Sequence, residues 1–378
     1  MKIMKWQQIV RDNVYACISG SYKEGVTDLN TLGNLAALRI DRKTNTPPVR
    51  KLPRLTYSQK RAVQKFYSPY VLFLTKRYHR LYTAITGRFY PQYIPEELYF
   101  MWIDRYFCDR DEARYLDNKC YYYRLFSNVK QPKLVAMRIG STWLDGGLNP
   151  VNGRQVLSLV GNEPEIVVKR ALNSQGGYGV HFISGSHLAS DFRKTIHSIH
   201  GDVVVQRPLK QHPQLAKLHP QSVNTIRMVS LLTKDKVKIY AAALKIGTGD
   251  SRTDNASQNG IYCGLKPDGS LRDYGILDNG TAVTRHPDLG YSFSGNQVPH
   301  FGKALALVKK AHAFLGHFRL VSWDVTIDEQ GEAVLIEANL TLGGINDVQM
   351  SCGPLFGKDT KKVLDEVMKG RRKVTTLL

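Results

Sequence analysis

VSWDVTIDEQGEAVLIEAN, residues 321–339, is the part of the sequence from which the fold of this chain is most directly inferred. Two apolar runs flank residues 328–331, Asp-Glu-Gln-Gly, and this pattern is typical of a β-hairpin with a short glycine-containing loop. We expect Asp328 to pair with Ala333 across a four-residue loop. That pairing fixes which side chains of the two strands share a face.

The predicted hairpin has one polar and one apolar face. Asp324 lies opposite Glu337, and Asn339 joins them because side chains alternate along a strand. The other face carries side chains suited to a core: Trp323, Val325, Ile327, Val334, Ile336 and Ala338. Two bare carboxylates ~5 Å apart would repel each other, and Mg²⁺, which takes oxygen ligands, would remove that repulsion. The pattern therefore predicts a metal site, unless this is an exposed hairpin whose polar side meets water.

The composition is that of a basic globular protein. The 378 residues are 42% hydrophobic and 10% aromatic, and the net charge is +21. Residues 1–90 hold 17 basic and 4 acidic residues, a net +13. The length allows two or three domains or lobes. The charge favours polyanionic partners, which include nucleic acid, anionic lipid and phosphorylated substrates.

The cysteines form no CxxC pair and no zinc-ligand spacing; they are Cys17, Cys108, Cys120, Cys263 and Cys352. An odd, scattered set is typical of reduced thiols in a cytosolic compartment. Charges lie at both ends of any apolar run near the N-terminus, so we expect no signal peptide. We expect no membrane span either, because no window approaches ~18 uninterrupted apolar residues.

Aromatic and basic side chains alternate through residues 57–110, and residues 71–85 carry apolar side chains at helical spacing. Such a helix could lie on an anionic membrane, or it could be a domain helix with a solvated charged face. Aromatic-plus-basic sequence also suits single-stranded nucleic acid. No nucleic-acid motif supports that interpretation, so we do not expect nucleic acid as a partner.

A strand, a glycine-rich loop and a second strand are predicted in EIVVKRALNSQGGYGVHFI, residues 165–183. Gly176, Gly177 and Gly179 let backbone amides approach an anion closely, and Lys169 enters from the preceding strand. The loop lacks the Gly-Lys-Ser/Thr of a Walker A loop, and no helix follows it as in a dinucleotide fingerprint. A flap over nucleotide phosphates and an ordinary hairpin turn both fit this pattern.

Two strands are predicted further along the chain. DVVVQRPL, residues 202–209, is an apolar strand that leaves its ladder at Pro208. Such a strand exposes backbone groups that could pair with the edge of an adenine. SVNTIRMVSLL, residues 222–232, places Arg227 on one face of the next strand.

A further strand and a polar loop complete the candidate site. KVKIYAAALKIG, residues 236–247, presents Lys245 on one side. The loop over residues 247–264 is rich in Gly, Ser, Asn and Asp, and polar loops of this length are usually functional or disordered. Within it, Arg252 and Asn255 are candidates for holding anionic substrate groups, because arginine suits a bidentate grip on carboxylate or phosphate.

Together these segments resemble the ATP-grasp superfamily, and within it the sugar-transfer-associated ATP-grasp proteins found with bacterial polysaccharide biosynthesis. The resemblance runs from about residue 95 to residue 357 and is carried by DNKCYYYRLF, VVKRALNSQGGYGV, VVVQRPLKQHPQLAKLHPQSVNTIRM, HPDLG…VPHF and SWDVTIDEQGEAVLIEANLTLGG. It implies an α+β fold in which two α+β lobes clamp a nucleotide, preceded by a basic, mainly helical N-terminal region. The implied parts are residues 1–110 (N-terminal region), 111–205 (small lobe with the glycine-rich flap), 206–357 (large lobe with the metal site) and 358–378 (basic tail).

The resemblance also implies which residues bind ATP: Lys119, Lys169, Gly176, Gly177, Gly179, Gln206, Arg207 and Leu209. The two lysines would contact the phosphates or the adenine side, and the glycines would cover the phosphates. The last three would form a hinge that recognises adenine through main-chain atoms. Many ATP-grasp enzymes have a carboxylate just after the hinge for the ribose hydroxyls, whereas residues 210–214 here read KQHPQ. The side chains that would replace it are Gln211, His212 or Gln214.

Three further sets follow from the resemblance. The catalytic set is Lys169, Arg227 and Arg252; the substrate-binding set is Lys245, Arg252 and Asn255; and the metal set is Asp324, Glu337 and Asn339. Arg227 would face the transferred phosphoryl group, and Glu337 would bridge two Mg²⁺ ions. Arg252, with Lys245 or Asn255, would position the acceptor carboxylate.

The implied reaction is ATP-dependent ligation through an acyl phosphate, with ATP and two Mg²⁺ ions as cofactors. The expected substrates are a small-molecule or lipid-linked sugar carboxylate of polysaccharide biosynthesis and an amine donor, joined by a C–N bond. Two alternatives are a kinase-like transfer to a sugar hydroxyl and a non-catalytic basic protein that binds membrane or nucleic acid. The expected location is cytoplasmic, with peripheral contact to the anionic inner membrane through the basic N-terminal region.

Overall fold

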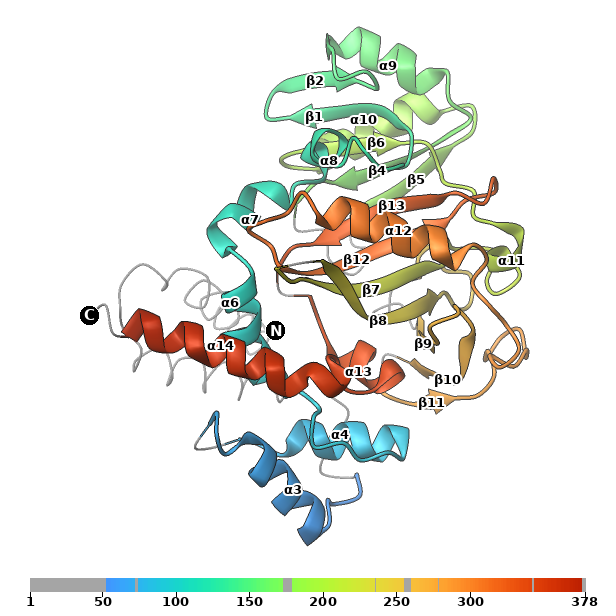
Figure 1. Ribbon diagram of the computed structural model, residues 1–378. Coiled ribbons are helices and arrows are strands. Elements are labelled where there is room, and N and C mark those ends of the chain that lie inside the picture. The colour runs from blue at the N-terminus through green and yellow to red at the C-terminus, as the bar shows by residue number, and fades with distance from the viewer. Residues whose placement is uncertain are drawn as a thin grey trace, which may run out of the picture. The chain divides into compact units, whose positions relative to one another are not determined.

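The computed structural model describes residues 52–71, 74–172, 179–234, 236–254, 260–277, 279–341 and 343–375. The chain divides into two compact units (Figure 1). One unit combines the N-terminal residues up to 110 with residues 279–281 and 353–378, and the other holds residues 111–278 and 282–352.

The first unit is helical where it is described. Its elements are α3 (Tyr57–Tyr67), α4 (Arg77–Thr86), α5 (Glu96–Leu98), the π-helical η2 (Tyr99–Ile103), α6 (Asp104–Phe107), the 3-10 turn η5 (Gly357–Asp359) and α14 (Thr360–Thr375). Thr56 and Gln59 form a capping box that starts α3. The Tyr67 hydroxyl donates to the Tyr93 carbonyl at 2.7 Å, and the Tyr70 hydroxyl donates to Asp365 of α14 at 2.7 Å. These bonds tie segments from both ends of the chain into one unit.

The helix predicted over residues 71–85 begins at Arg77, so that prediction was too long. α4 buries Tyr78, His79, Leu81 and Tyr82. His79 is therefore not part of a solvated basic face, because burial lowers its pKa to about 4 and keeps the ring neutral. The buried stripe agrees with a domain helix.

The second unit contains seven helices in its described residues: α7 (Arg110–Leu116), α8 (Lys119–Leu125), α9 (Gly153–Gly161), α10 (Leu188–Ser198), α11 (Pro213–Ala216), α12 (Phe301–His312) and α13 (Asn346–Cys352). A six-stranded sheet runs in the order β3 (Pro150–Val151), β2 (Thr142–Asp145), β1 (Leu134–Ile139), β6 (Val203–Gln206), β4 (Glu165–Arg170) and β5 (Val180–Ser184). A seven-stranded sheet runs in the order β11 (Ala282–Val283), β10 (Leu271–Leu277), β9 (Ile261–Leu265), β8 (Val237–Ile246), β7 (Thr225–Leu232), β12 (Leu320–Ile327) and β13 (Ala333–Asn339).

The six-stranded sheet has a different neighbour on each face. On one face its side chains form a core with α9 and α10, which contribute Val156, Val160, Leu188 and Phe192. On the other face Val204 and Met137 pack with Cys120 of α8. Val167 and Lys169 of β4 share that second face, because they pair with Gln206 and Val204 of β6. The charged side chain of Lys169 is thereby directed away from the α9–α10 core.

The seven-stranded sheet is apolar on the face that α12 covers (Figure 1). There Trp323 donates to the Ser230 hydroxyl at 2.7 Å, and His312 of α12 bonds the same hydroxyl at 2.7 Å. Every polar atom of this small network has a partner, as a buried polar group requires. The opposite face of the sheet is polar and carries the candidate site.

The predicted hairpin is confirmed as β12 and β13, and Asp324 does pair with Glu337. The predicted register of the turn was wrong, because Ile327 rather than Asp328 pairs with Ala333. The register shifts by one residue between Val325 and Asp324, so Asp324 again lies opposite Glu337, as expected. One extra residue on β13 therefore offsets the extra residue in the turn, as a β-bulge does.

The bulge also changes the assignment of the apolar face. Leu335 pairs with Val325, and Ala333 pairs with Ile327, so these two replace the predicted Ile336 and Val334 beside the core residues of β12. The physical reason is that a shift of one residue moves every following side chain to the other face.

No helix in the described part of the chain has the combination of length and apolar composition that crossing a bilayer requires.

Candidate active site

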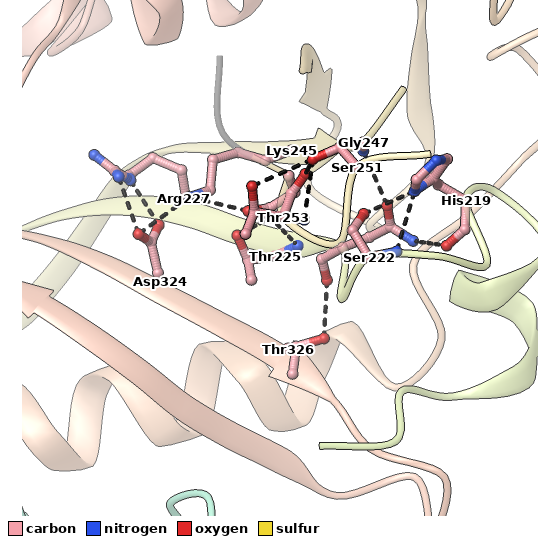
Figure 2. Close-up of polar contacts among 12 residues, drawn as sticks. His219, Ser222, Thr225, Arg227, Lys245, Gly247, Ser251, Thr253, Asp324 and Thr326 are labelled. Carbon is pink, nitrogen blue, oxygen red and sulfur yellow. Dashed lines mark hydrogen bonds and ion pairs between the residues drawn. The ribbon is translucent and has the colours of Figure 1, made fainter. Parts of the chain in front are cut away.

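An ion pair between two neighbouring strands lies at the centre of the polar face. Arg227 of β7 pairs with Asp324 of β12 in the sheet register. Its Nε donates to Oδ1 at 2.7 Å and its Nη2 to Oδ2 at 3.0 Å, a bidentate arrangement (Figure 2). Burial opposes charge on both groups, but each partner outweighs it: the pKa of Asp324 falls to about 2 and the pKa of Arg227 is raised.

Lys245 of β8 extends this pair into a chain of alternating charges. Its Nζ lies 3.2 Å from Asp324 Oδ2 and 3.8 Å from Asp254 Oδ1, and Lys245 is only 3% exposed. Burial favours the neutral amine, but Asp254 and then Asp324 reverse this effect and raise the pKa of Lys245. Lys245, predicted as a substrate ligand, is thus held between two carboxylates.

Asp254 is a site residue that the sequence analysis did not select. Its Oδ2 accepts a hydrogen bond from the backbone nitrogen of Thr225 at 2.8 Å and another from the Thr225 hydroxyl. Burial raises its pKa, and Lys245 opposes that rise. The available signal was its place in the polar loop beside Arg252, but no motif distinguished this carboxylate from its neighbours.

Two histidines anchor the start of the loop that carries Asp254. His219 bonds the Ser222 hydroxyl at 2.8 Å and the Gly249 carbonyl at 3.0 Å, and His286 bonds the Gly247 carbonyl at 2.9 Å. The two rings stack at 6.1 Å between centroids. Figure 2 shows His219 and Ser222 beside Gly247 at the end of the site away from Asp324. The loop is thereby fixed on the side of the large sheet.

Helix α8 brings a second cation to the hairpin. Asn118 caps the helix by accepting from Cys120 N at 3.0 Å, which places Lys119 in the first turn. Lys119 Nζ lies 2.7 Å from Glu337 Oε1, and the buried Tyr122, one turn along, donates to the Ala338 carbonyl at 2.7 Å. Because Cys120 packs on the six-stranded sheet, α8 joins the two sheets at the site.

Lys169 approaches from the six-stranded sheet. Burial and then the neighbouring Lys119 lower the pKa of Lys169 to about 8, while Glu337 and Asp254 act in the opposite direction. The charges of Lys119, Glu337 and Asp254 therefore all act on the Lys169 amine, although Glu337 and Asp254 belong to the other sheet. The structure thus brings together Lys119, Lys169, Arg227, Lys245, Asp254, Asp324 and Glu337, which we call the acid–base cluster.

The predicted hinge lies where β6 ends. Gln206 pairs with Leu134 and Val167 of the neighbouring strands, and its side-chain amide donates to the Tyr123 hydroxyl. The Arg207 side chain binds Glu163, with Nε 2.7 Å from the carboxylate, and its backbone nitrogen donates to the Lys133 carbonyl at 2.9 Å, so a contact with adenine would have to use its main-chain carbonyl. Leu209 is half-buried in the segment that leads to α11.

The three candidates to replace the ribose carboxylate differ sharply. The Gln211 side chain donates to the carbonyls of His219 and Ser222 and accepts from Asn224, so its hydrogen-bonding capacity is used inside the fold. His212 caps α11 by accepting from the backbone nitrogen of Gln214 at 3.2 Å. Gln211 is therefore excluded as a ribose ligand. Gln214 is exposed at the start of α11, so it stays a candidate for the ribose contact.

Arg252 does not join the acid–base cluster. Its Nη1 lies 2.7 Å from Glu165 Oε1, and its guanidinium lies over the Phe182 ring at 3.9 Å. Both partners belong to the six-stranded sheet, whereas Arg252 stands on a loop of the seven-stranded sheet. In this state Arg252 therefore links the two lobes and does not point at Arg227.

Of the remaining predicted residues, Gly176, Gly177 and Asn255 lie outside the described residues. Gly179 begins the return of the glycine-rich loop with φ +74°, and a side chain there would approach Arg170 Cδ to 3.1 Å. Both facts favour glycine at that position.

The predicted metal set is a partial fit to Mg²⁺. Asn339 donates its amide nitrogen to the Ser322 carbonyl at 3.1 Å, which leaves its amide oxygen as an acceptor, and Glu337 has one oxygen on Lys119. Both oxygens of Asp324, however, are bound by cations of the chain. No cluster of three or more His, Cys, Asp and Glu side chains is arranged for a metal in the described residues. Two carboxylates and an amide are hard oxygen donors, so the donor chemistry fits, but Asp324 must release a cation before it can serve as a ligand.

The charges of the cluster explain this arrangement. We expected a metal to relieve repulsion between Asp324 and Glu337, but Arg227, Lys245 and Lys119 already do so. Four cations stand against three carboxylates. A cluster with that balance attracts a polyphosphate more strongly than a free metal ion.

Two sheets that meet around such a cluster, one of them carrying an Asp–Glu–Asn hairpin, are the arrangement expected of the ATP-grasp class. Residues 102–364 match the family described as sugar-transfer associated ATP-grasp. The chain belongs to that family. No protein in a comparison with curated sequences matches the chain.

The chain is also similar to solved structures that are distant in sequence. The chain is similar to the D-Ala:D-Ser ligase VanG of Enterococcus faecalis (12% identity, TM-score 0.41, covering 69% of this chain and 63% of that chain). It is also similar to the biotin carboxylase domain of 2-oxoglutarate carboxylase from Hydrogenobacter thermophilus, solved with MgADP (12% identity, TM-score 0.41, covering 69% and 48%). A third is an ADP complex of N5-carboxyaminoimidazole ribonucleotide synthetase (10%, TM-score 0.37, 60% and 45%). The chain spans less than two thirds of the length of each.

Proposed function

We propose that this chain is an ATP- and Mg²⁺-dependent ligase that activates a carboxylate as an acyl phosphate and passes it to an amine, forming a C–N bond. The acid–base cluster is the observation that carries the proposal, in a chain of the sugar-transfer associated ATP-grasp family. Phosphoryl transfer depends mainly on position and charge neutralisation. A buried, net-positive cluster between two lobes suits that chemistry.

The cations of the cluster have different tasks in this proposal. Lys169 and Lys119, which approach from the six-stranded sheet and α8, hold the phosphates. Arg227 faces the transferred phosphoryl group and stabilises the charge that develops there. Lys245 stays between Asp254 and Asp324 and keeps Arg227 in place, because it shares the Asp324 carboxylate with it.

Mg²⁺, when bound with the nucleotide, would neutralise phosphate charge and be held by Glu337, Asn339 and Asp324. Because the cluster has four cations and three carboxylates, we expect the metal to enter together with the negatively charged ATP. Glu337 would exchange Lys119 for the ion, and the released lysine would turn to the phosphates. That two Mg²⁺ ions bind is implied by the resemblance to the ATP-grasp superfamily.

The acceptor is proposed to be a sugar or lipid-linked sugar carboxylate of cell-surface polysaccharide biosynthesis, with an amine as the second substrate. This part is supported by the family description, sugar-transfer associated. Arg252 and Asn255 remain proposed contacts of the acceptor, and Arg252 would have to leave Glu165 to make one.

Isotope transfer tests the reaction class. A panel of uronic acids labelled with ¹⁸O in the carboxylate is incubated with ATP, Mg²⁺ and a mixture of amino acids, and the phosphate and organic products are analysed by mass spectrometry. An acyl phosphate route transfers ¹⁸O from carboxylate to inorganic phosphate and gives an amide. Phosphorylated sugar without labelled phosphate would select the kinase-like alternative and overturn the ligase.

Two variants locate the chemistry. Arg227→Gln removes a charge that we assign to the transition state, so we expect kcat to fall by about 10²–10³-fold. Arg193→Gln is the matched control, because Arg193 is an exposed arginine of α10, which packs on the face of the six-stranded sheet opposite to Lys169. Equal loss in both variants would indicate a general defect of the fold rather than loss of a catalytic group.

A further inference from the structure

Tyr262 of β9 lies on the polar face of the seven-stranded sheet, beside the acid–base cluster. In the sheet register it pairs with Lys245 of β8, which in turn pairs with Thr225 of β7. Residues that pair across neighbouring strands point to the same face of a sheet. Lys245 and Thr225 both contact Asp254, so Tyr262 extends this row of polar side chains by one strand.

The charges of the cluster act on the Tyr262 hydroxyl. Burial raises its pKa to about 12, the cations Arg227 and Lys245 oppose that rise, and the carboxylates of Asp347 and Asp324 add to it. The hydroxyl therefore keeps its proton at neutral pH. A protonated phenol can donate one hydrogen bond to a ligand.

The Tyr262 hydroxyl has no hydrogen-bond partner among the described residues, although Tyr262 is only 8% exposed. Its oxygen is not completely enclosed, so a ligand can reach it. A tyrosine whose ring is buried usually satisfies its hydroxyl inside the fold. Tyr262 is therefore an exception that needs a physical reason.

Four other buried or half-buried tyrosines of this unit follow the rule. Each donates its hydroxyl to a main-chain carbonyl, at 2.7 to 3.1 Å: Tyr122 to Ala338, Tyr123 to Pro132, Tyr274 to Met350 and Tyr291 to Leu218. The hydroxyl of Tyr262 instead lies beside the cations of the cluster, as a donor that the chain itself does not use.

Arg227 presents a second donor to the same region. Its Nε and Nη2 bind Asp324 (Figure 2), and its Nη1 has no partner among the residues that the structure describes. This nitrogen is not completely enclosed either. A hydroxyl and a guanidinium nitrogen on one face of the sheet match the two oxygens of a carboxylate.

The order of the strands separates Tyr262 from the groups assigned to the phosphates. Lys119 contacts Glu337 on β13, at one edge of the sheet. From that edge Arg227 lies two strands away on β7, and Tyr262 lies two strands further on β9. In-line transfer of a phosphoryl group places the attacking oxygen opposite the leaving group. With Arg227 at the transferred group, the acceptor belongs on the side of β8 and β9.

A simpler role for Tyr262 is packing, because α13 lies against β9 at Gly264. That role needs only the aromatic ring, and phenylalanine would serve equally well. It does not account for a hydroxyl that faces Arg227 and Lys245 without an internal partner among the described residues. The two roles therefore differ in what loss of the hydroxyl alone should do.

We propose that Tyr262 binds the carboxylate acceptor: its hydroxyl donates a hydrogen bond to one carboxylate oxygen, beside Nη1 of Arg227, while the other oxygen attacks the γ-phosphorus of ATP. The new O–P bond forms as the bond to the ADP oxygen breaks, ADP leaves with that electron pair, and Tyr262 keeps its proton. This inference rests on the proposed ligase function and specifies its acceptor site. Arg252, which is bound to Glu165, is not required for this contact.

Uronate kinetics on the full chain test this contact. The probes are D-glucuronate and D-galacturonate, with D-glucose and D-galactose as analogues that lack the carboxylate, and ADP release is measured with ATP, Mg²⁺ and a mixture of amino acids. Tyr262→Phe should raise the uronate KM by about tenfold or more, with a smaller change in kcat, because it removes a hydrogen bond to a charged group. Calorimetry should show an unchanged affinity for ADP, since the cations that hold the phosphates are intact.

Tyr274→Phe is the matched control. Tyr274 lies on the neighbouring strand β10, and its hydroxyl donates to the Met350 carbonyl of α13 at 3.1 Å. This variant should keep the uronate KM of the unaltered chain but should lower the melting temperature, because an internal hydrogen bond is lost. Tyr262→Phe should keep the melting temperature, because the described residues lose no internal hydrogen bond.

The outcomes separate failure of this contact from failure of the proposed function. An unchanged uronate KM in Tyr262→Phe, or an equal rise in Tyr274→Phe, would overturn the contact and leave the ligase reaction in place. A lower melting temperature of Tyr262→Phe with an unchanged KM would show a packing role alone and also overturn it. If neither uronate raises ADP release by the unaltered chain above the rate with its analogue, the proposed acceptor fails, and the role of Tyr262 fails with it.

Discussion

Asp324 is surrounded by charge that the chain itself supplies. Its two oxygens bind Arg227 and Lys245, and it is 3% exposed. Removal of one partner from a buried pair leaves the other charge uncompensated, which is far more destabilising than loss of an exposed pair. We therefore expect stability and the proposed catalysis to depend on the same carboxylate.

Asp324→Asn should lower the free energy of unfolding by about 3 kcal/mol, because Arg227 and Lys245 lose their shared anion. Urea unfolding measures this difference. Glu337→Gln is the control, since the Glu337 side chain is 29% exposed and its pair should contribute only about 1 kcal/mol or less. Equal destabilisation by both changes would contradict a special role for the buried pair.

The same pair predicts a dependence on pH. The pKa of Asp324 is lowered to about 2 in the folded chain, below its usual value of ~4. Its contribution is therefore present above pH ~4 and is lost as the pH falls through that window toward 2. The stability difference between the unaltered chain and Asp324→Asn should shrink over this range, and a difference that stays constant would contradict the assigned pKa.

We expect nucleotide binding to depend on pH through the protonation of Lys169. Its pKa is lowered to about 8, and phosphate groups bind the protonated amine. The affinity for ADP should be highest below pH 8 and should fall as the pH rises through it, by about tenfold at pH 9 relative to acidic conditions. Calorimetry between pH 6.5 and 9.5 measures this. Lys169→Arg keeps its charge over the whole range, so its ADP affinity should be nearly independent of pH.

At the scale of elements, the hairpin and α8 define the site together. β12 and β13 supply Asp324 and Glu337, whereas α8 supplies Lys119 and fixes it through the Tyr122 bond to Ala338. The bulge in β13 sets which residues reach the polar face. A single residue inserted in or removed from that strand would therefore exchange the proposed metal ligands for core residues.

Gly264 of β9 packs closely against α13. A side chain at Gly264 would overlap the Ser351 carbonyl, so Gly264→Ala must displace α13 and should cost about 1–3 kcal/mol in unfolding free energy. Gly302→Ala is the matched control, because Gly302 lies near the start of α12 with nothing within 4 Å of a new methyl group. There the change should be neutral or stabilising, as alanine favours a helix. Thermal unfolding of the two variants compares them directly.

At the scale of the whole molecule, the net charge of +21 favours anionic partners. The excess in residues 1–90 is proposed to hold the chain on anionic membranes. Long-range attraction of this kind is screened by salt, with a Debye length of about 10 Å at 0.1 M. The chain need not insert a helix to bind in this way.

The full chain should float with vesicles that contain phosphatidylglycerol at low salt and should be released at about 0.5 M salt, because screening shortens the range of the attraction. Vesicles of phosphatidylcholine alone are the control. Flotation that is equal for both lipids, or unaffected by salt, would remove membrane docking from the proposal.

The sequence by itself determined the hairpin, the strands around it and every residue of the acid–base cluster except Asp254. Local signals were sufficient there: glycine in the turn, alternating polarity in β12, and proline after β6. The strand predicted at residues 202–209 proved to be Val203–Gln206, and the strand predicted at 236–247 proved to be Val237–Ile246. These are differences of one to three residues at each end, where hydrogen bonding rather than composition sets the limit.

Only the tertiary structure decided how charges are paired. Asp324 lies opposite Glu337 in the strand register although the turn was predicted wrongly. The reason is a bulge that adds one residue, and no feature of the composition marks it. Asp254 and Arg252 lie two residues apart in one loop, yet one is buried beside Lys245 and the other crosses to Glu165. Which cation reaches which carboxylate depends on residues that are distant in sequence but adjacent in space. Local sequence patterns carry no information about those distances.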